Sequence, residues 1–118
     1  RGLIFSGIPD PDLRQFRAST YHIEARIVDA ALQVTDRALE AGDLDLARWA
    51  LTQGLLASPD HEDLVAGCVR TEYQAGNMDK VAELVDHLSA TARRLGVDLN
   101  EDTTRIIDTV THLGRKAS

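Results

Sequence analysis

The chain has 118 residues, and 13 Lys and Arg against 19 Asp and Glu give it a formal net charge of −6. This length predicts a single domain over residues 1–118, with a core that needs no disulfide or metal. The acidic balance argues against direct nucleic acid binding, which depends on clustered Lys and Arg. No apolar run is long enough to insert into a membrane, and a lone cysteine, Cys68, excludes an internal disulfide framework.

The start of the sequence bears on the protein to which it belongs. It begins at Arg1 rather than at a methionine, and no signal-peptide pattern follows. We therefore expect a piece of a larger protein that is located in the cytoplasm. Glycine and proline are frequent over residues 1–13, which predicts an irregular segment there.

Glycine and proline also divide the rest of the chain into helices. Residues 12–41 contain neither, and their apolar residues recur at the spacings of one helix face. Gly42, Gly76 and Gly96 each follow a helical pattern, and Ser58-Pro59 ends another. No segment alternates apolar and polar residues as a strand does. The predicted fold class is all-α, with helices over residues 14–41, 43–57, 60–75, 77–95 and 101–114.

Two apolar stripes run along the first of these helices. One consists of Tyr21, Ala25, Val28, Leu32, Thr35 and Leu39, and the other of Ile23, Ile27, Ala31, Val34 and Ala38. Two adjacent stripes predict a helix that is buried over a wide arc and packs against two neighbours.

A period of 34 residues is the most informative feature of the sequence. Ala41-Gly42-Asp43 recurs as Ala75-Gly76-Asn77 at that offset, which is the period of the tetratricopeptide helix–turn–helix. We expect both glycines at tight turns between antiparallel helices, and we expect Ala47 and Gly54 to let helix backbones approach closely. The pattern predicts tetratricopeptide-like stacked antiparallel helix hairpins, which form a fragment of an α-solenoid with about five helices.

The second copy of the repeat departs from the first. Val81 stands where the first copy has Ala47, and no proline ends its second helix. These differences are typical of a terminal or divergent repeat. The alternative is an unrelated helical bundle in which the two turns share their spacing by chance.

Several motifs resemble those of the bacterial transcriptional activator domain, and together they cover nearly the whole chain. They are Arg1-Gly2-Leu3 with Phe5-Ser6-Gly7, Ala41-Gly42-Asp43 with Ala47, Ser58-Pro59, and Leu95-Gly96-Val97-Asp98 before an acidic helix start. The last motif is the most specific. Leu99 and Asp102 depart from the pattern, because the family usually has Pro and Glu at these positions.

The resemblance implies a helical regulatory module that acts by self-association or partner contact. In activators of the antibiotic-regulatory type, such a domain follows a winged-helix DNA-binding domain. In other actinobacterial proteins, a similar domain ends a polypeptide with membrane spans and a peptidoglycan-binding LysM module. The first hypothesis is therefore a protein-interaction module of a transcriptional activator. The alternative is an assembly scaffold in a membrane- or envelope-linked protein, with no role in transcription.

The titratable side chains do not form the pattern of a catalytic or metal site. No two of the histidines share a helix at ligand spacing: His22, His61, His87 and His112. Cys68 has Glu72 rather than a basic residue one turn away, so we expect a small buried residue and not a nucleophile. The paired carboxylates stand at predicted helix starts, where capping explains them. We predict no enzymatic activity, no metal and no cofactor.

One surface is a candidate binding site for a protein partner. In stacked hairpins the first helix of each repeat lines the concave side, which exposes faces of the first and third predicted helices there. Six residues fall on those faces: Asp29, Asp36, Glu40, Arg70, Tyr73 and Gln74. A tyrosine beside an arginine is favoured at interaction hot spots. The alternative is that Tyr73 packs in the core near Gly76.

Overall fold

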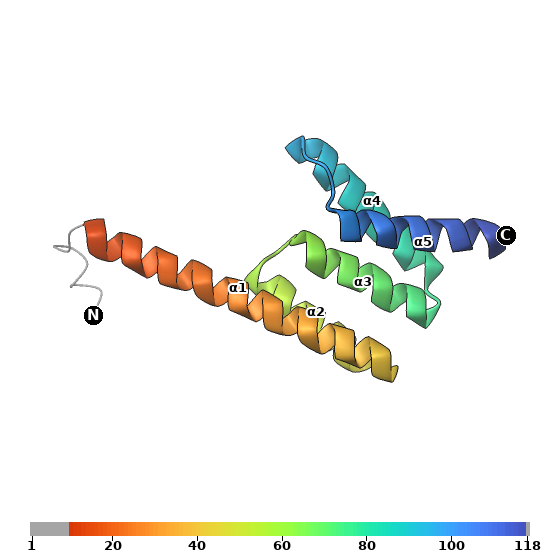
Figure 1. The fold of residues 1–118 in the computed structure, drawn as a ribbon, viewed down its shortest axis with the longest axis horizontal. Helices are drawn as coiled ribbons and strands as arrows, with labels where there is room; N and C mark the ends of the chain where they lie inside the picture. Colours follow the sequence, from red (N-terminus) through yellow and green to blue (C-terminus); the bar gives the residue numbers. More distant parts are fainter. Residues whose placement is uncertain (1–9, 118) are drawn as a thin grey trace.

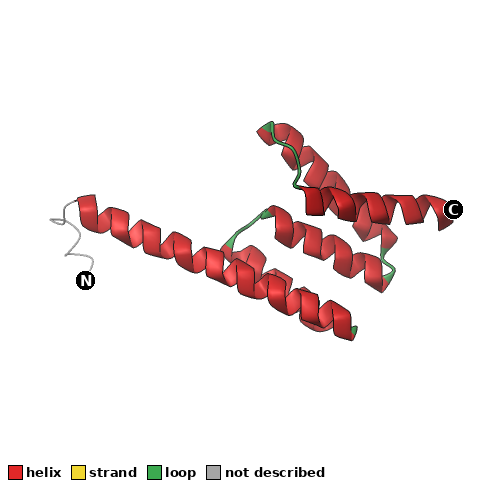
Figure 2. Ribbon diagram, viewed as in Figure 1, coloured by secondary structure: helices red, strands yellow, loops and turns green. Residues whose placement is uncertain are grey.

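The fold of the chain is all-α, as predicted. In a computed structural model, the backbone of residues 10–117 and the side chains of residues 22–112 are described. The described backbone contains no strand (Figure 2). It forms five helices: α1 (Asp10–Ala41), α2 (Leu44–Ala57), α3 (Glu62–Ala75), α4 (Met78–Leu95) and α5 (Glu101–Ala117).

The two terminal helices extend further than their predicted ranges. Helix α1 begins at Asp10, so residues 10–13 are helical rather than irregular. Pro11 is compatible with this start, because the first turn of a helix makes no use of its backbone N–H groups. Residues 1–9 of the predicted irregular segment lie outside the described residues. Helix α5 continues through Gly114 to Ala117, since a single glycine weakens a helix without ending it.

Gly42 and Gly76 occupy equivalent bends, as the repeat predicts. Their φ angles are +76° and +83°, in the left-handed region that glycine adopts without strain. The residue after each glycine closes the turn in the same way. The N–H of Asp43 donates to the carbonyl of Ala38 at 2.8 Å, and that of Asn77 to the carbonyl of Glu72 at 2.9 Å. Each bend reverses the chain into the next helix (Figure 1).

Small residues let the first three helices approach closely. A Cβ atom on Gly54 of α2 would lie 3.0 Å from the Cβ of Ala31 in α1 and 2.8 Å from Leu64 Cδ2 in α3. A Cβ atom on Gly67 of α3 would lie 2.8 Å from Leu51 Cδ2 in α2. A side chain at Gly67 would therefore force the end of the Leu51 side chain to shift, and one at Gly54 would displace Leu64 and press directly on Ala31, which is too short to move aside.

Helix α1 packs against two neighbours, α2 and α3, but only along its C-terminal half. Residues of both stripes are buried there: Val28, Ala31, Thr35, Ala38 and Leu39. The expected burial is wrong at the start of both stripes, because Ile23 is 57% exposed, Ile27 is 40% exposed, and Ala25 is exposed as well. Tyr21, the first residue of the other stripe, lies outside the residues whose side chains are described. The N-terminal half of α1 projects away from the other helices (Figure 1). Helix α2 is too short to reach it.

A second part of the core joins α3, α4 and α5. Its buried members are Val65, Val69, Val81, Leu88 and Val110. Through it, α5 contacts α3 in addition to α4. Helices α1, α3 and α5 therefore follow one another side by side, with α3 in contact with both of the others.

Candidate functional site: a hollow between α1, α3 and α5

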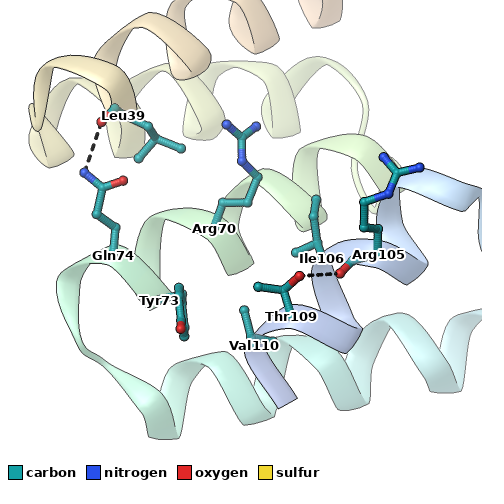
Figure 3. A pocket seen from close by; sticks show the side chains of 8 residues that line it. All are labelled: Leu39, Arg70, Tyr73, Gln74, Arg105, Ile106, Thr109 and Val110. Atoms are coloured by element: carbon teal, nitrogen blue, oxygen red, sulfur yellow. Dashed lines mark hydrogen bonds between the residues drawn. The ribbon is translucent and has the colours of Figure 1, made fainter. Parts of the chain in front are cut away.

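A hollow of about 410 Å³ lies where α1, α3 and α5 meet (Figure 3). Within side chains 22–112, its lining residues come from these three helices: Leu39 from α1, Arg70, Tyr73 and Gln74 from α3, and Arg105, Ile106, Thr109 and Val110 from α5. Helical spacing explains why each set shares one face, since residues three and four apart are neighbours on a helix. Its floor is mostly apolar, and we call it the α1–α3–α5 hollow.

Gln74 ties two of the three helices together at one end of the hollow. Its side-chain amide donates a hydrogen bond to the backbone carbonyl of Leu39 at 3.1 Å (Figure 3). That carbonyl belongs to the last turn of α1 and also accepts the backbone N–H of Gly42 at 3.2 Å. The bond from Gln74 therefore adds a second donor to this carbonyl and holds α3 against α1.

Two guanidinium groups stand at the edge of the hollow, on the same side of it (Figure 3). Arg70 Nη1 donates to Asp36 Oδ1 at 2.7 Å, between side chains that are 38% and 55% exposed. Arg105 Nη1 donates to Asp102 Oδ1 at 3.1 Å. Exposed ion pairs such as these contribute at most about 1 kcal/mol to stability. These ion pairs instead fix the orientation of the two arginine side chains.

Asn100 positions α5, and with it one wall of the hollow. Its backbone N–H donates to Glu62 Oε2 at 2.8 Å, and its side-chain amide donates to Asp63 Oδ1 at 3.0 Å. Its side-chain oxygen accepts the N–H of Thr103 at 2.8 Å, which caps the start of α5. The acidic residues at the start of α3 thus do more than offset a helix dipole, because they hold α5 in place through Asn100.

The structure brings together some of the six predicted surface residues and separates others. Arg70, Tyr73 and Gln74 line the hollow, and Asp36 is joined to it through its ion pair with Arg70. Glu40 is exposed on α1 but does not line the hollow, and Asp29 lies beside a smaller depression near Ser58 and His61. Tyr73 is half-buried. It lines the hollow, as a binding-site residue would, and it also packs against the core of α3, α4 and α5, as the alternative stated.

Sequence reasoning missed five of the lining residues, which are Leu39, Arg105, Ile106, Thr109 and Val110. Four of them lie on α5, which was not assigned to the concave side. The order of the helices in the chain could have identified the residues on α5. A helix that follows a complete hairpin takes the place of the first helix of the next repeat, and such helices line the concave side.

Two titratable side chains outside the hollow, Cys68 and His61, contribute to the fold. Cys68 is half-buried, and burial raises the pKa of its thiol. Its surroundings therefore favour the neutral form over the reactive thiolate. His61 caps α3, with its Nδ1 accepting the N–H of Asp63 at 3.2 Å. No cluster among side chains 22–112 groups three potential metal ligands. Among helices α1–α5, over residues 10–117, none has both the length and the apolar character of a membrane span.

Comparisons with known proteins agree with the architecture. A family model described as tetratricopeptide repeat matches residues 38–94, from the last turn of α1 almost to the end of α4. Comparisons with curated proteins and with solved structures found no significant match. Repeats of this kind generally mediate protein–protein interaction and are non-catalytic. The chain therefore carries an all-α, tetratricopeptide-like helical domain built from stacked antiparallel hairpins.

Proposed function

We propose that this domain is a non-catalytic protein-interaction module that holds its partner in the α1–α3–α5 hollow. The observation that carries the proposal is the hollow itself, which combines an apolar floor with an aromatic ring and two arginines. Tyrosine and arginine are enriched in protein interfaces, where a few well-packed residues near the centre supply most of the binding energy. A shallow surface shared by three helices suits a segment of another protein.

We further propose that the module serves a regulator of the bacterial transcriptional activator type. Support comes from the resemblance described above, and chiefly from Leu95-Gly96-Val97-Asp98. Gly96 is a left-handed C-cap of α4, with φ of +70°, so this motif has a defined role in ending one helix before the next begins. A winged-helix sequence upstream in the gene would support this setting. Membrane spans and a LysM module there would favour an envelope-linked scaffold instead.

Site-specific photo-crosslinking in the full-length parent protein tests the interaction surface. Thr109 on α5 and Thr52 on α2 are a matched pair, because both are exposed and each donates to the carbonyl four residues earlier. Only Thr109 lines the hollow. A photoreactive amino acid at position 109 is expected to give a discrete crosslinked protein band, while one at position 52 gives none. Equal crosslinking from both positions, or none from position 109, would contradict the proposed surface.

A further inference from the structure

The chemistry of the hollow specifies the kind of segment that fits it. We infer that its ligand is a peptide in which a large apolar side chain stands close to a single carboxylate. The inference rests on the proposed function and adds the recognition chemistry. The apolar group would enter the hollow, and the carboxylate would bind the guanidinium group of Arg105.

The floor of the hollow selects the apolar group. Leu39, Tyr73, Ile106 and Val110 come from three different helices and converge on one space (Figure 3). Two of the polar side chains in the lining are already bonded. Thr109 Oγ1 donates to the carbonyl of Arg105 at 2.9 Å, and Gln74 donates to the carbonyl of Leu39. An aliphatic or aromatic side chain therefore gains contacts here without breaking existing hydrogen bonds.

The charges around the hollow select a carboxylate. Among side chains 22–112, Arg70 and Arg105 are the only charged ones that line it, although acidic residues outnumber basic ones in the chain by 19 to 13. Each arginine donates to its own aspartate through Nη1 alone. A guanidinium group has five N–H donors. Both arginines can therefore donate to a carboxylate of the ligand while they keep their bonds to Asp36 and Asp102.

The charged residues around the hollow also limit how many acidic groups the peptide ligand can carry and determine where they bind. Asp36 and Glu40 are exposed on α1, and Asp36 is already paired with Arg70. Like charges there would repel a second carboxylate of the ligand. On α5, Glu101, Asp102 and Asp108 are exposed as well, so acidic groups on both helices limit the ligand to one carboxylate. Arg105 is the more accessible of the two arginines, since it is 71% exposed and Arg70 is 38% exposed. Arg105 is therefore where a ligand carboxylate is held.

Selection from a random peptide library displayed on phage tests this recognition chemistry with the folded chain. Enriched peptides are expected to share a large apolar residue within a few positions of Asp or Glu. Binding of one synthesised peptide is then measured by fluorescence polarisation. Arg105→Gln is expected to weaken it about tenfold. Replacing the peptide carboxylate by its amide should cause a similar loss, with no further loss when both changes are combined.

Two further variants locate the binding site and control for charge. Thr109→Trp fills the hollow from an exposed position and is expected to abolish binding, with folding checked by circular dichroism. Arg93→Gln removes an exposed arginine from the last turn of α4, outside the hollow, and should leave the affinity unchanged.

The outcomes separate this inference from the proposed function. Peptides that need the hollow, but contain no acidic residue or tolerate Arg105→Gln, would overturn the inference and leave the interaction surface standing. Basic peptides would overturn it in the same way. Peptides unaffected by Thr109→Trp, or no enrichment at all, would overturn both the peptide chemistry and the use of the hollow.

Discussion

Ala47 shows how a single side-chain volume governs the packing of the first hairpin. It is completely buried and packs against Ala38 and Leu39 of α1. The two helices meet through small side chains at this level, as they do at Gly54. No neighbouring cavity is available for extra atoms in a contact of this kind, so added volume must displace a helix.

Replacing Ala47 by leucine is expected to lower the free energy of unfolding by about 1–3 kcal/mol, because the larger side chain overpacks the contact between α1 and α2. Urea denaturation followed by far-ultraviolet circular dichroism measures the change. Ala90→Leu is a suitable control, since Ala90 is exposed on α4 and should change stability by less than about 0.5 kcal/mol. An unchanged stability for Ala47→Leu would show that the helices are not close-packed there.

Glu72 illustrates how one carboxylate can join three elements. Its two oxygens accept hydrogen bonds from Arg48 of α2, from Nε at 3.0 Å and from Nη2 at 3.1 Å. The side-chain amide of Asn77, in the turn between α3 and α4, donates to it at 2.7 Å. The hydrogen bonds from Arg48, followed by that from Asn77, hold the pKa of Glu72 below its ordinary value. The ionised form therefore stabilises the fold.

The stabilisation by Glu72 is expected to depend on pH. A carboxyl group whose pKa is lower in the folded state contributes fully above its unfolded value of about 4.5, and the contribution is lost as pH falls through the folded value. Glu72→Gln should therefore lower the urea midpoint at pH 7, and its difference from the unmodified chain should shrink as the pH is lowered from 5 to 3.

The pH series needs a control for the loss of a negative charge. Glu83→Gln removes a carboxylate from an exposed position on α4, where the nearest cation, Lys80 Nζ, is 3.8 Å away. Its effect on the urea midpoint should be small at neutral pH. A difference between Glu72→Gln and the unmodified chain that stays constant down to pH 3 would rule out the proposed ionic role of Glu72.

Helix length decides which part of α1 belongs to the core. Helix α1 has 32 residues and α2 has 14, so a partner of less than half its length covers only the C-terminal part. The contact of Gly54 with Ala31 lies close to the end of α2. One turn further toward the start of α1, Ile27 is already exposed.

Because only part of α1 is packed, substitutions at adjacent residues should differ sharply in their effect on the free energy of unfolding. Replacing both Ile23 and Ile27 by glutamine should change the free energy of unfolding by less than about 0.5 kcal/mol, because both are exposed. Val28→Ala should cost about 2 kcal/mol, since Val28 is buried and loses two methyl groups. Thermal and urea unfolding at several protein concentrations measure both. A large loss for the double variant would mean that another molecule covers this face.

The whole molecule is an elongated stack rather than a sphere, with principal extents of 64 × 34 × 20 Å. Each helix contacts its neighbours in the stack, and the core is divided into clusters at successive levels. This is the organisation expected of repeat proteins, in which stability comes from each unit and from its interface with the next. The α1–α3–α5 hollow is a product of that stacking, since its walls belong to three successive levels.

The sequence by itself determined the all-α class, the turns and the hairpin order. Gly42, Gly76 and Asp43 act through local backbone geometry and capping, which the neighbouring residues decide. The 34-residue offset between the two turns then set how the hairpins repeat. Local preferences of this kind can be interpreted without coordinates.

Only the tertiary structure decided which residues face one another across the stack. Leu39 and Val110 line the same hollow although they are far apart in the chain, because α5 docks on α3 through Asn100 and a shared apolar cluster. The exposure of Ile23 likewise depends on where α2 stops relative to α1. An apolar stripe shows that a face can be buried, but burial itself requires a second element at the same level.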